Sequence, residues 1–447
     1  MAEKRVVSVI GLGKLGVPMV ACLAEKGFTV IGVDINQSAI DQINAGKAPV
    51  QEPGLDEMLH RNRERVRATA DYSDAIAHSD VTFIIVPTPS ESDGGFSLKY
   101  IHSVLDPIGK SIRHKTTFHL VVITSTVMPG ATGSEIKAAL ETASGKTCGE
   151  GFGLCYSPEF IALGNVIHDM LNPDFILIGE SDPKSGAMLE EIYLQLSNGN
   201  PPVSHMNLVN AELAKISVNT FVTTKISYAN MLGEMCERIP GADVDVVTNA
   251  IGQDSRIGKK YLKGATGYGG PCFPRDNVAF ALIAHSVGAS PAIAEATDEI
   301  NRKQASRLAN HLLPRLTPNS KVGILGLSYK PDTNVIEQSQ GLALAKELLS
   351  QGFSVILYDP LALDNVRQIL GTQPDYADSA KDCVQRADAV VITTSSKEFQ
   401  TLVPADFASA NSSTKLKLLL DCWRVLDRSQ FSHVCEYLAL GVGPSTV

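Results

Sequence analysis

The chain has 447 residues, of which 44% are hydrophobic and 19% charged, a composition that fits a globular protein with room for two or three domains. The net charge of -9 argues against a nucleic-acid surface, and no apolar run is long enough to span a bilayer. The eight cysteines form no CxxC pair and no cluster with histidine, so we expect neither a disulfide framework nor a metal site.

Residues 1–10 pass from a charged start into an apolar strand with no secretory signal, and we therefore expect a cytoplasmic protein. The strand runs into a GxGxxG turn, which is followed by a helix through Glu25 and a second strand at residues 29–34. The glycines allow a tight turn and the close approach of a pyrophosphate, and the helix N-terminus favours its negative charge. The residues expected to hold a dinucleotide are Gly11, Gly13, Lys14, Leu15, Gly16 and Asp34.

Asp34 bears on which dinucleotide is bound. Its carboxylate can accept hydrogen bonds from the ribose hydroxyls and would repel a 2′-phosphate, so the pattern favours NAD over NADP. The alternative interpretation is a Rossmann-like turn that binds no dinucleotide.

Alternating strands and helices continue to about residue 160, and three of these strands end in polar side chains. Ligands bind at the carboxyl ends of parallel strands, which places these side chains beside the cofactor. They are Thr88, Thr126 and Glu159. A turn or cap role for the threonines, and a solvated loop position for the glutamate, are the alternatives.

A long helical pattern runs from Asn210 to about Arg238. Lys215 and Asn219 are four residues apart and therefore share one face, among apolar and small neighbours. A lysine and an amide on such a face lose hydration unless they meet a polar group, which suggests a ligand. A snorkelling lysine and a satisfied amide are the alternative.

Glycines and prolines surround Cys272 in the stretch from residue 261 to 276, so the backbone can approach a ligand closely. A reactive thiol needs nearby positive charge, which Lys263 and Arg275 supply in sequence, or a helix N-terminus. We expect a helix from Asn277, with Asp276 at its start. The alternative is an inert cysteine buried beside a turn.

The C-terminal third repeats the first nucleotide-fold pattern. Residues 351–359 match residues 26–34, which predicts a second α/β domain, but this copy lacks GxGxxG and offers Lys330 instead. We expect a nucleotide of another kind there, with Arg424 at the carboxyl end of a later strand. A surface position is the alternative for each cation.

These elements predict an α/β chain of two Rossmann-like doubly wound domains, joined by a long central helix and a helical dimerisation region. The expected boundaries are 1–203 for the NAD-binding domain, 204–304 for the central region and 305–447 for the C-terminal domain.

With these motifs in place, the chain resembles the nucleotide-sugar 6-dehydrogenase family, also called the UDP-glucose/GDP-mannose dehydrogenase family, along nearly its whole length. The motifs that carry the resemblance are GLGKLGVP with Asp34, EPGL at 52–55, the STV ending at Val127, SPEF, AELAKISVNTF, GYGGPCFPRD and GLSYKPDT at 326–333. The resemblance implies oxidation of the C6 alcohol of a sugar nucleotide to a carboxylate with two NAD and no metal.

The resemblance also implies the roles of the catalytic residues. Cys272 is the nucleophile, which holds the aldehyde as a thiohemiacetal and then forms a thioester that water hydrolyses. Lys215 and Asn219 stabilise the developing oxyanion. The proton-handling and water-positioning group is Asp276, Glu159 and Thr126.

A larger set of residues is expected to bind the UDP-sugar. Arg256 resembles the family arginine that reaches into the neighbouring subunit's site, which implies a functional homodimer, and Lys330 and Arg424 resemble the contacts on the phosphate side. The full expected set is Glu159, Phe160, Lys215, Asn219, Arg256, Tyr261, Lys263, Tyr268, Gly269, Lys330 and Arg424.

Two departures bear on the substrate. UDP-glucose dehydrogenases usually carry a second acid where this chain has Leu163, and an Arg-Glu-Ser element where it has Ile336-Glu337-Gln-Ser339. We favour UDP-glucose, with a UDP-N-acetylhexosamine (GlcNAc, ManNAc or GalNAc) second and a GDP-sugar third. A two-electron hydroxyacid dehydrogenase and a nucleotide-sugar sensor without turnover are the other hypotheses.

Overall fold

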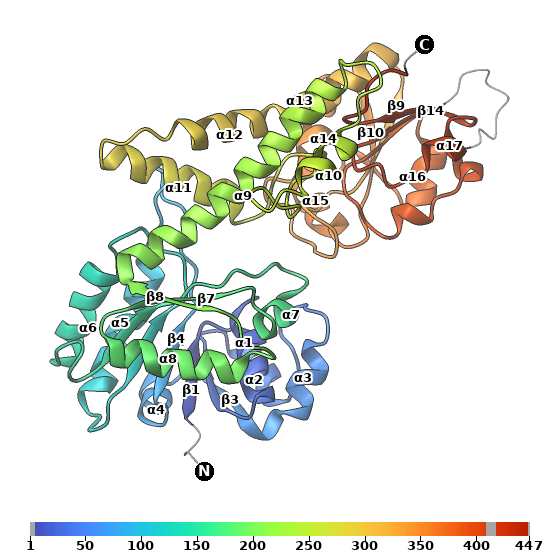
Figure 1. Ribbon diagram of the computed structural model, residues 1–447. Coiled ribbons are helices and arrows are strands. Elements are labelled where there is room, and N and C mark those ends of the chain that lie inside the picture. The colour runs from blue at the N-terminus through green and yellow to red at the C-terminus, as the bar shows by residue number, and fades with distance from the viewer. Residues whose placement is uncertain (1–4, 408–416, 446–447) are drawn as a thin grey trace. The chain divides into compact units, whose positions relative to one another are not determined.

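The computed structural model describes residues 5–407 and 417–445, and it divides into two compact units, Met1–Ser217 and Val218–Val447 (Figure 1). The charged start expected at residues 1–4 lies outside the described part. Among the described residues, no helix combines the length and the hydropathy needed to cross a bilayer.

The first unit is built on an eight-stranded sheet with the order β3-β2-β1-β4-β5-β6-β7-β8, in which β6 and β7 are antiparallel and the other pairs parallel. Its strands are β1 (Val6–Ile10), β2 (Thr29–Val33), β3 (Val66–Thr69), β4 (Val81–Ile84), β5 (Leu120–Ile123), β6 (Gly153–Tyr156), β7 (Ile176–Glu180) and β8 (Val203–Asn207).

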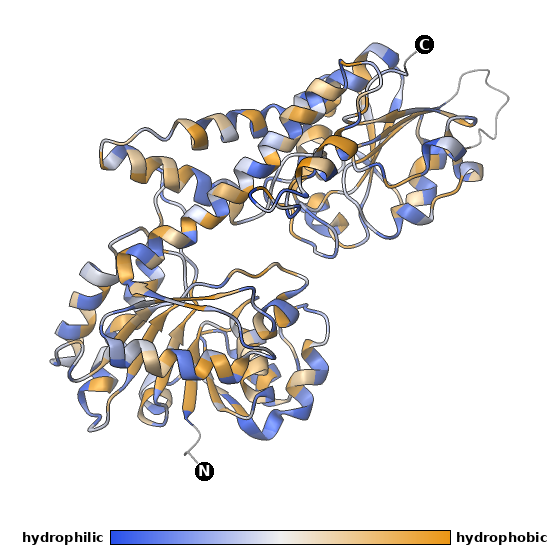
Figure 2. Ribbon diagram, viewed as in Figure 1, coloured by the Kyte–Doolittle hydropathy of each residue, from blue (hydrophilic) through white to orange (hydrophobic). Residues whose placement is uncertain are grey.

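The helices of this unit are α1 (Gly16–Glu25), α2 (Gln37–Asn44), α3 (Leu55–Arg61), α4 (Tyr72–Ala77), α5 (Lys99–Arg113), α6 (Lys137–Ser144), α7 (Val166–Leu171) and α8 (Pro183–Leu196), with short turns η1 (Arg63–Arg65) and η2 (Thr132–Ile136). They cover both faces of the sheet: α1, α2, α3, α7 and α8 pack on one face, and α4, α5 and α6 on the other. The central strands are therefore apolar on both sides, as Figure 2 shows by their colour.

The long helix α9 (Leu208–Cys236) confirms the helix expected from residues 210 to 238. The division between the two units falls within it, after Ser217.

The second unit contains a six-stranded parallel sheet with the order β11-β10-β9-β12-β13-β14. Its strands are β9 (Lys321–Leu325), β10 (Ser354–Tyr358), β11 (Asp375–Tyr376), β12 (Ala389–Ile392), β13 (Lys417–Asp421) and β14 (Cys435–Ala439). Its helices are α10 (Val244–Ile251), α11 (Phe273–Ser286), α12 (Ala292–Arg302), α13 (Gln304–Leu312), α14 (Gln340–Ser350), α15 (Leu363–Leu370), α16 (Ala380–Arg386) and α17 (Arg428–Phe431), with turns η3 (Leu313–Arg315), η4 (Phe399–Thr401) and η5 (Pro404–Phe407).

The internal repeat extends to atomic detail. Gly11 and Gly326 both adopt a positive φ, at 97° and 105°, and each donates its N–H to the carbonyl of the last residue of the neighbouring strand. Asp34 accepts a hydrogen bond from the Leu12 N–H, and Asp359 accepts one from the Leu327 N–H. Both units are therefore Rossmann-like, as expected.

One expected boundary is wrong. The helix expected from Asn277 begins at Phe273, directly after Cys272. Pro274 lies in its first turn, where a missing N–H costs no hydrogen bond, so the proline starts this helix and does not delay it. The three-domain division at 203 and 304 stays a prediction, because the two compact units do not test it.

Candidate active-site residues in the two units

The glycine-rich turn of the first unit has a distinct use for each glycine. A Cβ on Gly11 would lie 2.4 Å from the Ile85 carbonyl oxygen, and one on Gly16 would lie 1.8 Å from the Gly11 carbonyl oxygen. A Cβ on Gly13 would meet nothing within 4 Å. Gly11 and Gly16 are therefore required by the fold, whereas Gly13 leaves open space at the start of α1, which fits a pyrophosphate.

Asp34 lies at the carboxyl end of β2, beside this turn. Its Oδ2 accepts from the Leu12 N–H at 2.6 Å, and its Oδ1 accepts from the Asn36 N–H at 2.8 Å. A carboxylate can accept about four hydrogen bonds, so capacity remains for two ribose hydroxyls. The residues present fit the dinucleotide site that the sequence predicts.

Thr88 and Thr126 lie side by side at the carboxyl ends of β4 and β5. The Thr88 hydroxyl donates to the Thr126 carbonyl at 2.8 Å. The two loops thus meet at the edge of the sheet that carries the glycine-rich turn, because β4 pairs with β1.

Glu159 follows β6 and carries a buried carboxylate whose Oε1 has no hydrogen-bond partner. Burial raises its pKa to about 7, against the opposing effects of the Lys215 ammonium and the Tyr193 hydroxyl. The Lys215 Nζ donates to the Glu159 carbonyl at 2.7 Å and lies 4.6 Å from the centre of the Phe160 ring. Lys215 and Glu159 therefore form a polar pair beside the Phe160 ring inside the first unit, and the Glu159 carboxyl group can exchange a proton near neutral pH.

Leu163 occupies the position where the family resemblance led us to expect an acid, and the structure gives it an apolar role. It packs against the core cluster that includes α1 and α8. The loop around it is held by Glu52, which accepts from the N–H groups of Gly164 at 3.0 Å and Val166 at 2.7 Å. Sequence reasoning assigned no task to Glu52, although the EPGL motif marked it.

In the second unit, Cys272 is exposed and occupies the position directly before the first residue of α11, where its side chain makes no capping hydrogen bond. The positive end of a helix favours a thiolate. One turn into α11, the buried Asp276 carboxylate accepts from the Asn219 Nδ2 at 2.6 Å and pairs with Arg275 at 3.4 Å. The predicted grouping of Cys272, Asp276 and Asn219 therefore has a geometric basis within this unit.

The glycines before Cys272 make room for the protein's own chain. A Cβ on Gly269 would lie 2.4 Å from the Gln338 carbonyl oxygen, and one on Gly270 would lie 2.6 Å from the Tyr329 ring. The Gly270 N–H also donates to the Glu337 carbonyl at 2.8 Å. The cysteine loop thus packs against the segment that contains Lys330, so the two regions predicted for a sugar nucleotide are in contact.

Backbone strain concentrates in the same regions. Outside glycine, the described residues with positive φ are Tyr261, Asp332, Gln338 and Arg424. Such conformations cost about 1–3 kcal/mol each and persist where surrounding structure imposes them, often at functional sites.

Three of the residues predicted for the sugar nucleotide are exposed. The Arg256 side chain is 86% exposed and pairs with Asp254 at 2.6 Å, and Lys263 is likewise exposed. Tyr261 is half exposed and stacks edge-on with the Phe273 ring.

Tyr268 is buried and Arg424 is partly buried, and the side chains of both make contacts within the unit. The Tyr268 hydroxyl donates to Asp298 at 2.6 Å, and burial and this carboxylate raise the pKa of the phenol. All five N–H groups of Arg424 have acceptors, on Asp245, Gly264, Cys422 and Leu440. A ligand contact for either residue stays a prediction, and it would require an exchange of these partners.

Three further polar residues on α9 were not predicted from the sequence. The polar positions continue after Asn219 at the same spacing, and each side chain is buried and hydrogen-bonded: Thr223, Ser227 and Asn230. Thr223 bonds to Thr220 of α9 and to Asn277 of α11. Ser227 bonds to α12, and Asn230 bonds to the loop at Thr266. The signal was present as polar residues three or four apart on one helix face.

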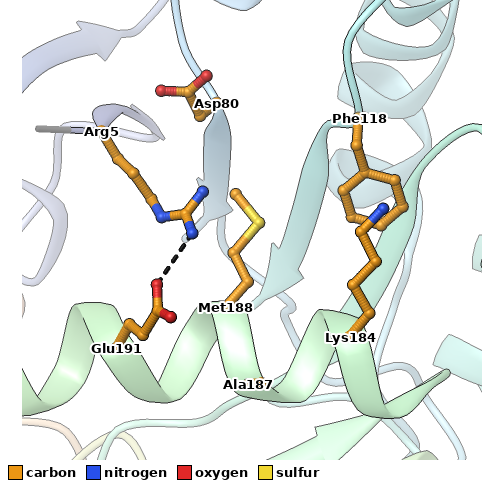
Figure 3. Close-up of a pocket in the computed structure, with 7 residues that line it drawn as sticks. All are labelled: Arg5, Asp80, Phe118, Lys184, Ala187, Met188 and Glu191. Carbon is orange, nitrogen blue, oxygen red and sulfur yellow. Dashed lines mark hydrogen bonds and ion pairs between the residues drawn. The ribbon is translucent and has the colours of Figure 1, made fainter. Parts of the chain in front are cut away.

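The predicted site residues do not line the surface hollow of about 310 Å³ drawn in Figure 3. The hollow lies at the amino-terminal edge of the first sheet, where Arg5 pairs with Glu191 at 2.9 Å and the Lys184 ammonium lies 3.6 Å from the Phe118 ring centre. Across the described residues, no group of three or more histidine, cysteine, aspartate or glutamate side chains is arranged to hold a metal ion. The expectation of a reaction without a metal stays a prediction.

Three family models match successive parts of the chain, all from the UDP-glucose/GDP-mannose dehydrogenase family. The NAD binding domain matches residues 5–197, the central domain residues 209–303 and the UDP binding domain residues 323–428.

Individual relatives are similar over most of their length. A UDP-glucose 6-dehydrogenase of Haloferax volcanii is 39% identical over 399 residues, which cover 88% of this chain and 92% of the relative. A GDP-mannose 6-dehydrogenase of Pseudomonas putida is 32% identical over 415 residues, covering 89% and 92%. The solved structure of a UDP-glucose dehydrogenase from Pyrobaculum islandicum superposes with a TM-score of 0.87 at 32% identity, covering 99% of this chain and 98% of the other.

Proposed function

Because this chain belongs to the UDP-glucose/GDP-mannose dehydrogenase family, we propose that it oxidises the C6 alcohol of a UDP-sugar to a carboxylate in two NAD-dependent steps. The observation that carries the proposal is Cys272, exposed at the N-terminus of α11 and one turn from the Asn219–Asp276 pair. A two-electron alcohol oxidation needs no such thiol.

UDP-glucose is the proposed substrate. The two relatives of highest identity reported, at 39% and 35%, are named UDP-glucose 6-dehydrogenases; a third of that name is 31% identical, and the named GDP-mannose enzymes are 32–34% identical. The match of residues 323–428 to a UDP binding domain supports a uridine nucleotide. Leu163 keeps a UDP-N-acetylhexosamine as the second candidate, because the acid usual in UDP-glucose enzymes is missing.

The first unit supplies the cofactor site. The turn from Gly11 to Gly16 and the Asp34 carboxylate would hold the pyrophosphate and the adenosine ribose. Bound NAD supplies the oxidising power for each of the two steps.

Cys272 keeps the half-oxidised sugar on the enzyme. Its thiolate adds to the C6 aldehyde to give a thiohemiacetal, and the second oxidation converts this adduct into a thioester. Lys215 and Asn219 are the proposed donors to the oxygen that carries negative charge in these steps.

Hydrolysis of the thioester requires a base that is deprotonated near neutral pH. Glu159 is suited to take the proton of the attacking water, because burial places its pKa at about 7. Asp276 and Thr126 are proposed to orient that water and its proton.

Purified protein with NAD and a panel of UDP- and GDP-sugars tests the proposal. We expect two NADH for each UDP-glucose consumed, and a fall in turnover of roughly 10³-fold or more in Cys272→Ser. One NADH per sugar, or a fully active serine variant, would remove the covalent mechanism. Preferred turnover of a UDP-N-acetylhexosamine would reassign the substrate.

A functional homodimer is part of the proposal. In the second unit, α9 carries exposed apolar side chains at helical spacing, namely Phe221, Tyr228, Met231 and Met235. The Arg256 side chain is largely exposed to solvent, which agrees with a role in a neighbouring subunit's substrate site.

A cytoplasmic location is also proposed. All eight cysteines lie in the described part of the chain and form no disulfide, which fits a reducing compartment. Cell fractionation with an antibody against the protein would test this.

A further inference from the structure

The segment from Gly264 to Gly270, which leads to Cys272, is buried along its whole length but forms no helix or strand. A buried irregular segment carries backbone N–H and C=O groups that have lost water, and each must find another partner. Here several of these partners are side chains, which form the hydrogen bonds that the backbone of a neighbouring strand would form in a sheet.

Asn230, on α9, holds the first half of the segment. Its Oδ1 accepts from the Ala265 N–H at 2.9 Å, and its Nδ2 donates to the Thr266 carbonyl at 3.2 Å. Upstream, the Arg424 Nη2 donates to the Gly264 carbonyl at 2.7 Å. The partly buried Arg424 therefore also holds this segment.

Asn301, on α12, holds the second half in the same way. Its Oδ1 accepts from the Tyr268 N–H at 2.8 Å and its Nδ2 donates to the Tyr268 carbonyl at 3.0 Å. One turn earlier on α12, Asp298 accepts from the Tyr268 hydroxyl at 2.6 Å. Helix α12 therefore forms hydrogen bonds with both the backbone and the side chain of Tyr268.

The contact between Asn301 and Tyr268 leaves no room for a side chain at residue 267, which is a glycine. A Cβ at this position would lie 2.4 Å from the Asn301 Oδ1, and the backbone there does not need a positive φ. A side chain at residue 267 would therefore push the Asn301 amide away from Tyr268 by steric contact alone.

Between Tyr268 and Cys272 the chain has two glycines and a proline. Glycine leaves the backbone many conformations, so the position of the thiol depends on what fixes the chain on either side. On the far side it is fixed by α11, which holds Asp276 against Asn219. On the near side, the last strong anchors are the Tyr268 contacts and the Gly270 N–H bond to Glu337.

We propose that Asn301 is a positioning residue for Cys272, with Asn230 as its counterpart at the start of the segment. The two amides set the geometry of the loop so that the thiol stands at the N-terminus of α11. The link to turnover rests on the proposed function, but the link to thiol reactivity does not.

The test measures Cys272 alkylation by iodoacetamide in the folded protein, followed by mass spectrometry at that cysteine, together with kcat, KM and Tm. Asn301→Leu and Gly267→Ala remove or displace the amide. We expect the alkylation rate of Cys272 to fall by about tenfold, because the thiol is displaced from the helix N-terminus that favours its thiolate. We also expect kcat to fall by about 10- to 100-fold, with KM for NAD unchanged.

Ser227→Ala is the matched control. The Ser227 hydroxyl donates to the Thr297 carbonyl of α12, so this variant weakens the same helix without touching the segment. We expect it to lower Tm while leaving alkylation and kcat unchanged. Should Asn301→Leu fail to fold, Gly267→Ala and Tyr268→Phe give the answer, the latter with a smaller change in the same direction.

The proposal is overturned if the folded Asn301 and Gly267 variants alkylate at the wild-type rate, whatever their Tm. If wild-type protein turns over no UDP-sugar, the proposed function fails, but the alkylation comparison still decides whether Asn301 positions the thiol.

Discussion

The carboxyl group of Glu159 has a pKa that its buried surroundings raise to about 7. Its carboxyl group is removed from water and lacks a partner for one oxygen, so the neutral form is favoured at pH values where an exposed glutamate is charged. A raised pKa in the folded protein means that the stabilising effect of the bound proton is complete below the ordinary pKa of 4.5 and is lost as the pH rises through about 7.

This predicts the pH dependence of thioester hydrolysis. The rate should rise with pH and level off above about 7, because the base must lose its proton first. Glu159→Gln should abolish this rise of the rate with pH and lower turnover by roughly 10²-fold or more. The same variant should raise the free energy of unfolding at pH 8, because a buried charge is removed. Single-turnover kinetics and urea unfolding at pH 5–9 measure both. An unchanged pH limb in the Gln variant would assign the titration to another group.

Asp34 gives a second prediction at this scale. Asp34→Ser should weaken NAD binding by about tenfold or more, because the ribose acceptors are lost, and should improve the NADP to NAD affinity ratio. Calorimetric titration with each dinucleotide measures the change. Asp359→Ser serves as the comparison, since the equivalent carboxylate of the second unit is buried and accepts from Leu327, Ser328, Leu361 and Ala362; it should lower stability and leave NAD affinity unchanged.

At the scale of elements, the turn between β1 and α1 separates folding requirements from ligand requirements. Gly16 allows α1 to pack directly on the strand end, whereas Gly13 faces open space. The second unit repeats the first contact, since a Cβ on Gly341 would lie 2.0 Å from the Gly326 carbonyl oxygen, but a longer segment containing Lys330 lies between those glycines. The shared geometry serves the fold, and we expect the differing segment to serve the ligand.

Two alanine variants therefore behave in opposite ways. Gly16→Ala should destabilise the protein by about 1–3 kcal/mol or more, because backbone atoms must move to admit the new carbon. Gly13→Ala should leave stability within about 0.5 kcal/mol and weaken NAD binding, since its Cβ fills the space for the pyrophosphate. Urea unfolding and NAD titration on both proteins separate the effects. Equal stability loss in the two variants would contradict this division.

At the scale of the whole molecule, the exposed apolar side chains of α9 bear on assembly. Phe221 is 66% exposed, and it shares a helix with exposed Tyr228, Met231 and Met235. An apolar stripe on a solvent-facing helix is usual where subunits meet.

We expect the protein to sediment as a dimer and Phe221→Asp to shift it toward monomer, with loss of activity if Arg256 completes the neighbouring site. Val287→Asp, at the end of α11, is the control, because that side chain is 73% exposed but does not belong to α9. Sedimentation velocity of wild type and both variants measures the result. A monomeric wild type, or a dimer that survives Phe221→Asp, would exclude this face as the interface.

The sequence by itself determined most of what depends on local pattern, although it placed the start of α11 four residues too late. GxGxxG followed by Asp34 specified the first Rossmann turn, the four-residue spacing of Lys215 and Asn219 specified a shared helix face, and the repeat at residue 351 specified the second nucleotide fold. These properties follow from backbone periodicity and from glycine conformation, which act over a few residues.

Only the tertiary structure decided which polar groups meet across long stretches of chain. The Asn301 grip on Tyr268, the Glu52 contacts beside Leu163 and the fully occupied guanidinium of Arg424 join residues far apart in sequence. Their cause is burial: once a segment leaves water, its donors and acceptors bond to whatever the fold brings near, and no local pattern encodes that choice. The pKa of Glu159 is set in the same way, by desolvation that exists only in the folded chain.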